Sequence, residues 1–128
     1  MTNSTTLTRK IAPEDAAVWV QVGEGQIHVS DIVDQTTSPE AAMTVGYARI
    51  AAGETLEISF PYDEVLVITK GCYMIRTPEG IELTASTGQV IYLPGGSSNQ
   101  ARAETDTEMV YVAAPPEVYA SHVAASVG

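Results

Sequence analysis

Apolar and polar residues alternate along most of the chain in short runs that are separated by turns containing glycine or proline. A spacing of two residues between apolar positions is typical of a β-strand with one buried face. The triplet Gly23-Glu24-Gly25, between two such runs, predicts a hairpin. The pattern predicts ten strands, at residues 18–22, 26–33, 42–51, 55–60, 64–69, 72–77, 81–85, 89–93, 98–103 and 107–113.

Ten short strands at near-regular spacing predict an all-β sandwich or barrel. Some of them, such as residues 65–68, are apolar on both faces, as expected of strands that are covered on both sides. A jelly roll that dimerises through one face fits this pattern best. Outside the strands, Pro13-Glu14-Asp15 predicts a short turn of helix, and the Ala-rich residues 117–127 predict a weak helix.

The length of 128 residues is that of one domain. We expect a flexible N-terminus at residues 1–8, the jelly-roll domain at residues 9–117 and a C-terminal tail at residues 118–128. Sixteen Asp and Glu against six Lys and Arg argue against nucleic acid or an anionic membrane surface as a partner. The single cysteine, Cys72, excludes an intrachain disulfide. Without an apolar signal region or a membrane-spanning apolar run, the protein is expected to be cytoplasmic.

Two stretches of the chain stand out by their spacing. In residues 60–71, Glu64 opens an apolar run that Gly71 closes after six intervening residues. In residues 88–99, a glycine precedes five strand residues, and a Pro-x-Gly turn follows them. Together they resemble the two motifs of the cupin superfamily, small barrels that often hold a metal on three histidines and a glutamate. The resemblance implies a single-domain cupin (RmlC-like) jelly-roll β-barrel.

The resemblance also gives the positions of the metal ligands. Counted from Glu64, the usual histidine positions of the first motif hold Ile58 and Phe60, and that of the second motif holds Asn99. Isoleucine and phenylalanine offer no atom to a metal ion. The resemblance therefore implies that three of the four usual ligands are replaced.

The two histidines of the chain lie outside the motif spacing. We expect His28 to be a hydrogen-bonded strand residue and His122 to be exposed to solvent in the tail. We therefore expect neither a metal ion nor another cofactor.

A narrower resemblance lies in Phe60-Pro61-Tyr62-Asp63-Glu64. It is similar to the cupin domain of EutQ-type ethanolamine-utilisation proteins, in which Tyr-Asp-Glu follows apolar residues at the histidine positions. Residues 91–97 fit the Ile-Pro-Lys-Gly-Ser segment of that family, and residues 110–115 match its closing Tyr-Val-x-x-Pro strand. The resemblance covers residues 29–120 and implies a role in the catabolism of ethanolamine or a related amine, where an acetate-kinase-like activity has been attributed to such proteins.

In the cupin alignment Glu64 points into the barrel, in phase with Ile58 and Phe60. Burial without a metal should raise the pKa of this carboxyl, unless an arginine from a facing strand keeps it ionised. Glu64 and Tyr62 are the candidate acid and base. The candidate ligand-binding residues are Tyr47, Ile58, Phe60, Tyr92, Asn99 and Tyr111, with Trp19 as a further aromatic residue.

Three functions remain open on this basis. The first is a metal-free cupin that binds a small organic molecule in its barrel, as an accessory or catalytic protein of an amine-type catabolic pathway. The second is a metal-independent isomerase, lyase or hydrolase that uses Glu64 and Tyr62. The third is an EutQ-like acetate kinase, for which the chain offers few cationic side chains. The residues leave open whether there is catalysis; a small-molecule ligand and a second copy in a homodimer are the expected partners.

Overall fold

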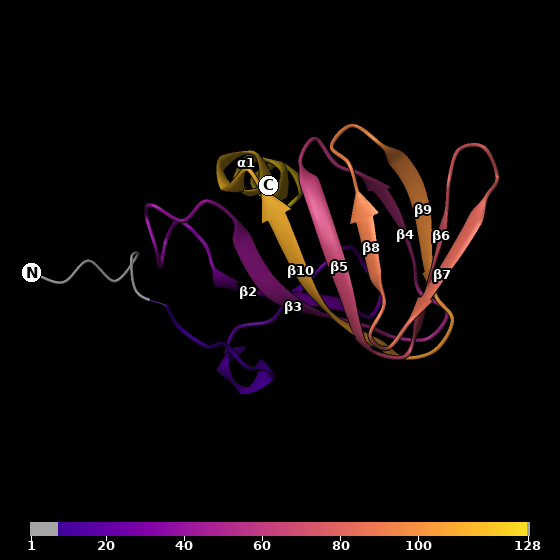
Figure 1. The fold of residues 1–128 in the computed structure, drawn as a ribbon, viewed down its shortest axis with the longest axis horizontal. Helices are drawn as coiled ribbons and strands as arrows, with labels where there is room; N and C mark the ends of the chain where they lie inside the picture. Colours follow the sequence, from indigo (N-terminus) through magenta and orange to yellow (C-terminus); the bar gives the residue numbers. More distant parts are fainter. Residues whose placement is uncertain (1–7, 128) are drawn as a thin grey trace, which may run out of the picture.

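The computed structural model describes residues 8–127, so that most of the N-terminus expected to be flexible, residues 1–7, lies outside the described residues, as does residue 128. Ten strands form two antiparallel sheets that face each other (Figure 1). A 3-10 turn at Pro13–Asp15 precedes them, and the helix α1 (Pro116–Val127) follows. The strands are β1 (Val20–Gln21), β2 (Ile27–Val33), β3 (Thr44–Ile50), β4 (Thr55–Ser59), β5 (Asp63–Lys70), β6 (Cys72–Arg76), β7 (Glu82–Ser86), β8 (Val90–Leu93), β9 (Ser98–Ala103) and β10 (Thr107–Ala114).

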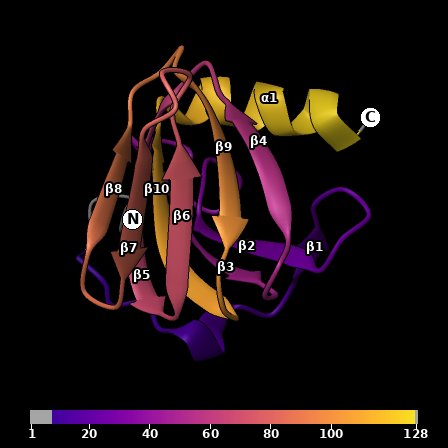
Figure 2. The same cartoon turned by 90° about the vertical axis from the view of Figure 1, so that its right-hand side faces the viewer.

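The two sheets have the strand orders β1-β2-β3-β10-β5-β8 and β4-β9-β6-β7. Most neighbouring strands are not consecutive in the chain, because the chain crosses repeatedly from one sheet to the other. Two antiparallel sheets connected in this way form a jelly roll, as the strand pattern predicts. In both ribbon views α1 lies at one end of the sheets (Figure 2).

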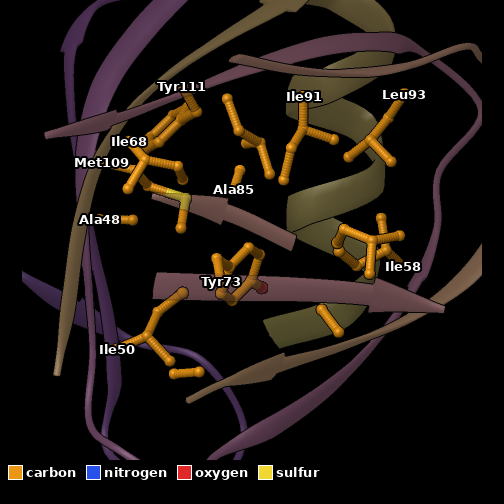
Figure 3. Close-up of a cluster of buried hydrophobic side chains, with 14 of the residues drawn as sticks. Ala48, Ile50, Ile58, Ile68, Tyr73, Ala85, Ile91, Leu93, Met109 and Tyr111 are labelled. Carbon is orange, nitrogen blue, oxygen red and sulfur yellow. The ribbon is translucent and has the colours of Figure 1, made fainter. Parts of the chain in front are cut away.

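Strand β5 shows the predicted alternation of faces. Glu64, Leu66 and Ile68 are buried between the sheets, whereas Val65 and Val67 are half-buried on the outer face. The inward residues of both sheets pack together as the core (Figure 3). The first motif thus places its carboxylate on the same face as the core residues.

The ends of the chain differ most from the sequence prediction. The strand expected at residues 18–22 shortens to β1, an edge strand of two residues that pairs with β2 alone. The tail expected to be weakly helical is the regular twelve-residue helix α1, because Tyr119 packs it onto the barrel core. No helix of the described residues is long and apolar enough to cross a membrane.

Candidate functional site

A cavity of about 260 Å³ lies between the two sheets. Inward residues of both sheets form most of its wall, and they are largely apolar. The edge strands β1 and β4 form part of one side, and α1 contributes Tyr119, His122 and Val123. Spacings of three and four residues place these three side chains on one face of the helix.

Glu64 projects into this cavity from the start of β5. The preceding residue, Asp63, points the other way and accepts a hydrogen bond at 2.7 Å from the backbone N–H of Gly95, which joins the strand to the turn of the second motif. Glu64 is 7% exposed, and no described residue forms a hydrogen bond or an ion pair with its carboxyl. Burial raises the pKa of the Glu64 carboxyl to about 8. The carboxyl is therefore mostly protonated at neutral pH when the cavity holds no ligand.

No arginine of the described residues lies where it could keep the Glu64 carboxyl ionised. None of the three that could have faced Glu64 lines the cavity. Arg49 lies over the Trp19 ring, Arg76 pairs with Glu82, and Arg102 pairs with Glu104. Glu64 is thus a carboxyl without a cation among the described residues that surround it.

Two tyrosine hydroxyls also lack a hydrogen-bond partner among the described residues. Tyr62 and Tyr73 are buried and line the cavity, and no described residue is hydrogen-bonded to either hydroxyl. Burial raises both pKa values, and the nearby charge of Glu64 raises them further. Since no fully enclosed side-chain nitrogen or oxygen of the described residues lacks a partner, these groups are in contact with the cavity space. One carboxyl and two hydroxyls therefore remain available to whatever fills the cavity.

The other two tyrosines of the wall are already engaged. The hydroxyls of Tyr111 and Tyr119 both donate to Oδ1 of Asp31, at 2.5 and 2.8 Å. The Tyr111 ring can cross β3 because residue 46 is glycine: a Cβ there would overlap the Tyr111 hydroxyl and the carbonyl oxygen of Ser30. Because Tyr119 lies in α1 and Asp31 in β2, this pair of hydrogen bonds fixes the helix to the larger sheet.

An aromatic cluster closes the cavity beneath α1. The rings of Phe60 and Tyr62 stack with their centroids 4.9 Å apart, and Tyr119 meets Tyr62 edge-on at 5.2 Å. His122 meets the Phe60 ring at 5.3 Å. The expectation that His122 is exposed in the tail is wrong: it is half-buried, because α1 turns it toward the barrel.

The candidate residues divide between the cavity and other surfaces. Ile58, Phe60, Tyr62, Glu64 and Tyr111 line the cavity. Asn99 is buried beside Ile58 in the neighbouring strand, and its amide donates to Oγ of Ser97 at 3.2 Å. The structure places Tyr47 and Tyr92 outside the cavity, because each lies between two inward residues of its strand and so projects from the outer face.

The sequence prediction missed three polar groups of the site, those of Tyr73, Tyr119 and His122. Tyr73 lies in a strand that is apolar on both faces, so alternation alone does not reveal its direction. Tyr119 and His122 are three residues apart in the tail, which is a signal for one helix face once the tail is accepted as a helix.

The residues at the expected metal position do not fit a cupin metal centre. Ile58 and Phe60 line the same cavity as Glu64, and their side chains offer a metal ion no nitrogen ligand. Among residues 8–127 no group of three or more His, Cys, Asp or Glu is arranged to hold a metal ion.

Comparisons with known proteins agree with the fold and the motifs. A search of curated proteins finds no match. The structure resembles ethanolamine utilization protein Q of Salmonella typhimurium LT2, with 26% identity, 70% of each chain covered and a TM-score of 0.64. It also resembles a protein of unknown function from Rhizobium leguminosarum, with 26% identity, 86% of this chain and 99% of that chain covered, and a TM-score of 0.70. An RmlC-like cupin from Shewanella frigidimarina shares the fold, with 11% identity, 85% and 92% coverage and a TM-score of 0.66.

The family model described as "Ethanolamine utilisation protein EutQ" matches residues 14–120 of the chain. That range contains both motifs, all ten strands of the described residues and the first residues of α1. The protein is therefore a cupin, and it belongs to the EutQ family.

Proposed function

We propose that the protein binds a small organic molecule in the barrel cavity without a metal ion, and that Glu64, Tyr62 and Tyr73 contact its polar part. The observation that supports this most directly is the set of three polar groups that face the cavity without a partner among the described residues. An apolar wall with a few placed polar groups is the usual composition of a small-molecule site. We place this binding in small-molecule catabolism, which the description of the family as ethanolamine utilisation proteins supports.

An NMR titration with a library of small polar fragments tests the binding. We expect shifts to concentrate on the cavity wall, at residues such as Glu64 and Tyr73, and to be weakened by Glu64→Gln. Tyr92→Phe is the matched control, because Tyr92 projects from the outer face. Shifts that avoid the cavity, or that persist unchanged in Glu64→Gln, contradict the proposal.

A second candidate function is acid–base catalysis by Glu64 with Tyr62. The pKa of about 8 favours it, since a carboxyl that titrates near the working pH can both donate and accept a proton. With a ligand that turns over, Glu64→Gln is expected to abolish turnover and to retain folding. Unchanged turnover in that variant excludes this role.

Phosphoryl transfer, as in an acetate kinase, has less support. Such reactions use cationic groups to stabilise the charge of the transferred phosphoryl group. None of the described lining residues of the cavity is a lysine or an arginine. The absence of acetyl phosphate formation from acetate and ATP, measured with magnesium present, is the expected result.

The metal-free state is a separate prediction, argued from the replaced ligands. Elemental analysis of the purified protein is expected to find no stoichiometric transition metal. A triple variant, Ile58→His, Phe60→His and Asn99→His, is the positive control, since it restores the donor set beside Glu64. About one metal ion per wild-type chain, lost in Glu64→Ala, would overturn the prediction.

A further inference from the structure

The charges around the cavity point to a positively charged ligand. Glu64 lies inside it, the exposed Glu57 on β4 lies at its edge, and Asp31 lies behind the hydroxyls of Tyr111 and Tyr119. No described lysine or arginine is among the lining residues, and the whole chain carries a net charge of −10. An anion entering this site would meet carboxylates without a compensating cation among the described residues. A cation would find Glu64 without a partner there, and Glu57 and Asp31 hydrogen-bonded but in no ion pair.

The groups without a partner among the described residues also match one type of cation in their number and hydrogen-bonding character. A carboxylate oxygen of Glu64 and the hydroxyl oxygens of Tyr62 and Tyr73 are three acceptors, and a primary ammonium group has three N–H donors. We propose that the ligand is a small primary ammonium ion, held with its –NH₃⁺ group between Glu64, Tyr62 and Tyr73. This rests on the proposed function and adds the chemical class of the ligand.

The rest of the wall suits the remainder of such a molecule. The cavity volume of about 260 Å³ lies below the range of about 300–1,000 Å³ typical of drug-sized ligands, so the carbon chain is short. Apolar side chains such as Ile27 and Leu66 contact that chain. The neighbouring Phe60 and Tyr62 rings add a favourable environment for the positive charge.

Binding of an ammonium ion is coupled to the ionisation of Glu64. The carboxyl has a pKa of about 8 in the empty cavity, so below that pH the cation must displace a proton. Affinity then rises by up to about tenfold per pH unit and becomes constant above pH 8, as proton linkage requires. The other titratable groups that face the cavity are Glu57, Tyr62, Tyr73, Tyr111, Tyr119 and His122.

Three probes of one shape and different charge test the class of the ligand: 3-methylbutylamine, 3-methylbutanol and 3-methylbutanoate. Titration calorimetry and NMR shifts are measured at about pH 6.5, 7.5 and 8.5, where the amine stays protonated. We expect the amine to bind at least tenfold more tightly than the alcohol, with affinity that increases with pH, and the carboxylate to show no cavity shifts. The amine is also expected to release up to about one proton on binding below pH 8.

Variants distinguish the contribution of Glu64 to binding and its pH dependence from the contributions of the other titratable groups. Glu64→Gln is expected to weaken binding of the amine about ten- to hundredfold at pH 8.5, as for the loss of a charge-assisted hydrogen bond. The same variant is expected to abolish the pH dependence of the affinity. Tyr73→Phe is expected to weaken binding less, His122→Gln to retain the pH dependence, and Tyr92→Phe to bind like the wild type. Thermal melting confirms that each variant is folded.

Two outcomes overturn the inference, and they differ in what they mean for the proposed function. Tighter binding of the alcohol or the carboxylate, lost in Glu64→Gln, leaves the cavity as a binding site but excludes an ammonium ligand. Absence of cavity shifts with all three probes excludes this ligand class, and the fragment library then decides whether the cavity binds anything.

Discussion

Glu64 is a carboxyl that the fold buries and leaves without a cation among the described residues. Its neighbours on the inner face of β5 are Leu66 and Ile68, which remove water from the site without replacing its hydrogen bonds. At neutral pH the carboxyl is therefore mainly neutral in the folded protein and mainly charged in the unfolded chain. This difference couples the stability of the protein to pH.

The first prediction concerns this coupling. Glu64 has a pKa of about 8 in the folded state, against a reference value of 4.5, so between these values the folded state binds more protons than the unfolded state. Stability that is present below pH 4.5 is lost as the pH rises, by up to about 1.4 kcal/mol per pH unit, until the loss is complete above about pH 8. Urea unfolding at a series of pH values measures this.

The control for this prediction is Glu64→Gln, which has nearly the same shape but no proton to lose. The free energy of unfolding of the wild type minus that of the variant is expected to fall across the same pH window. A difference that is independent of pH would mean that Glu64 has an ordinary pKa in the folded state.

The second prediction concerns Gly46, over which the Tyr111 ring passes. In Gly46→Ala the new methyl group would overlap the Tyr111 hydroxyl and the backbone of Ser30, and the backbone cannot move away without breaking the pairing of β2 with β3. We expect a loss of stability of about 1–3 kcal/mol, as for other overpacked cores, measured by urea unfolding.

Gly25→Ala is the matched control for Gly46→Ala. Its methyl group would meet the end of the Glu54 side chain, which is flexible and can turn away. A similar loss in both variants would contradict the overlap with Tyr111 and Ser30 as the reason for glycine at residue 46.

At the scale of elements, α1 completes the wall of the cavity that the strands leave open. Its contacts with the barrel include the Tyr119 hydrogen bond to Asp31, the Gln35 hydrogen bond to Glu117, the packing of the aromatic rings and the packing of Val118 and Val123. A strand in the sheets is held by backbone hydrogen bonds along its length, whereas the helix depends on these few side-chain contacts. Its stability is therefore separable from that of the sheets.

The third prediction follows for Tyr119→Phe. Loss of the hydroxyl removes the hydrogen bond to Asp31 but leaves the ring, and it is expected to cost about 1 kcal/mol. Hydrogen exchange is expected to become faster in α1 and to stay unchanged in β5 and β10. Asp31→Asn removes the charge that accepts the hydrogen bonds of both Tyr111 and Tyr119, so it should accelerate exchange in α1 more than Tyr119→Phe does. Equally accelerated exchange in all elements would contradict a helix whose stability is separable from that of the sheets.

At the scale of the whole molecule, part of the outer face of the six-stranded sheet is apolar. Val65, Val67 and Val110 are half-buried there, and Val90 and Tyr92 on the edge strand β8 are 58% and 62% exposed. An exposed apolar edge strand readily pairs with another chain. A second copy of this chain is the partner we expect on this face.

The fourth prediction is a homodimer at micromolar concentration, measured by light scattering. Val90→Glu is expected to shift the protein toward monomer, because it would bring like charges together across a symmetric interface. Leu83→Glu is the control, since Leu83 is 51% exposed on the other sheet. A wild-type monomer, or equal dissociation in both variants, would contradict an interface on this face.

Alternation along the strands made the fold predictable, because each of the ten strands has turn residues at its ends. The cupin resemblance implied that Glu64 would face inward in phase with Ile58 and Phe60, and all three line the cavity. Alternation could not predict the direction of Tyr73, since that strand has no polar face. The contribution of α1 was not predictable, because the helix is stabilised by packing on the barrel and hardly by the propensity of its own residues.

The position of α1 has a consequence for how such a protein diverges. The pairing of the strands determines the architecture of the barrel, and α1 takes no part in it. Three side chains of that helix nevertheless form part of the cavity wall. Substitutions at residues 119, 122 and 123 therefore reshape the pocket without disturbing any strand register. Ligand preference and barrel architecture are encoded in separate stretches of the chain, so selection can alter the first while conserving the second.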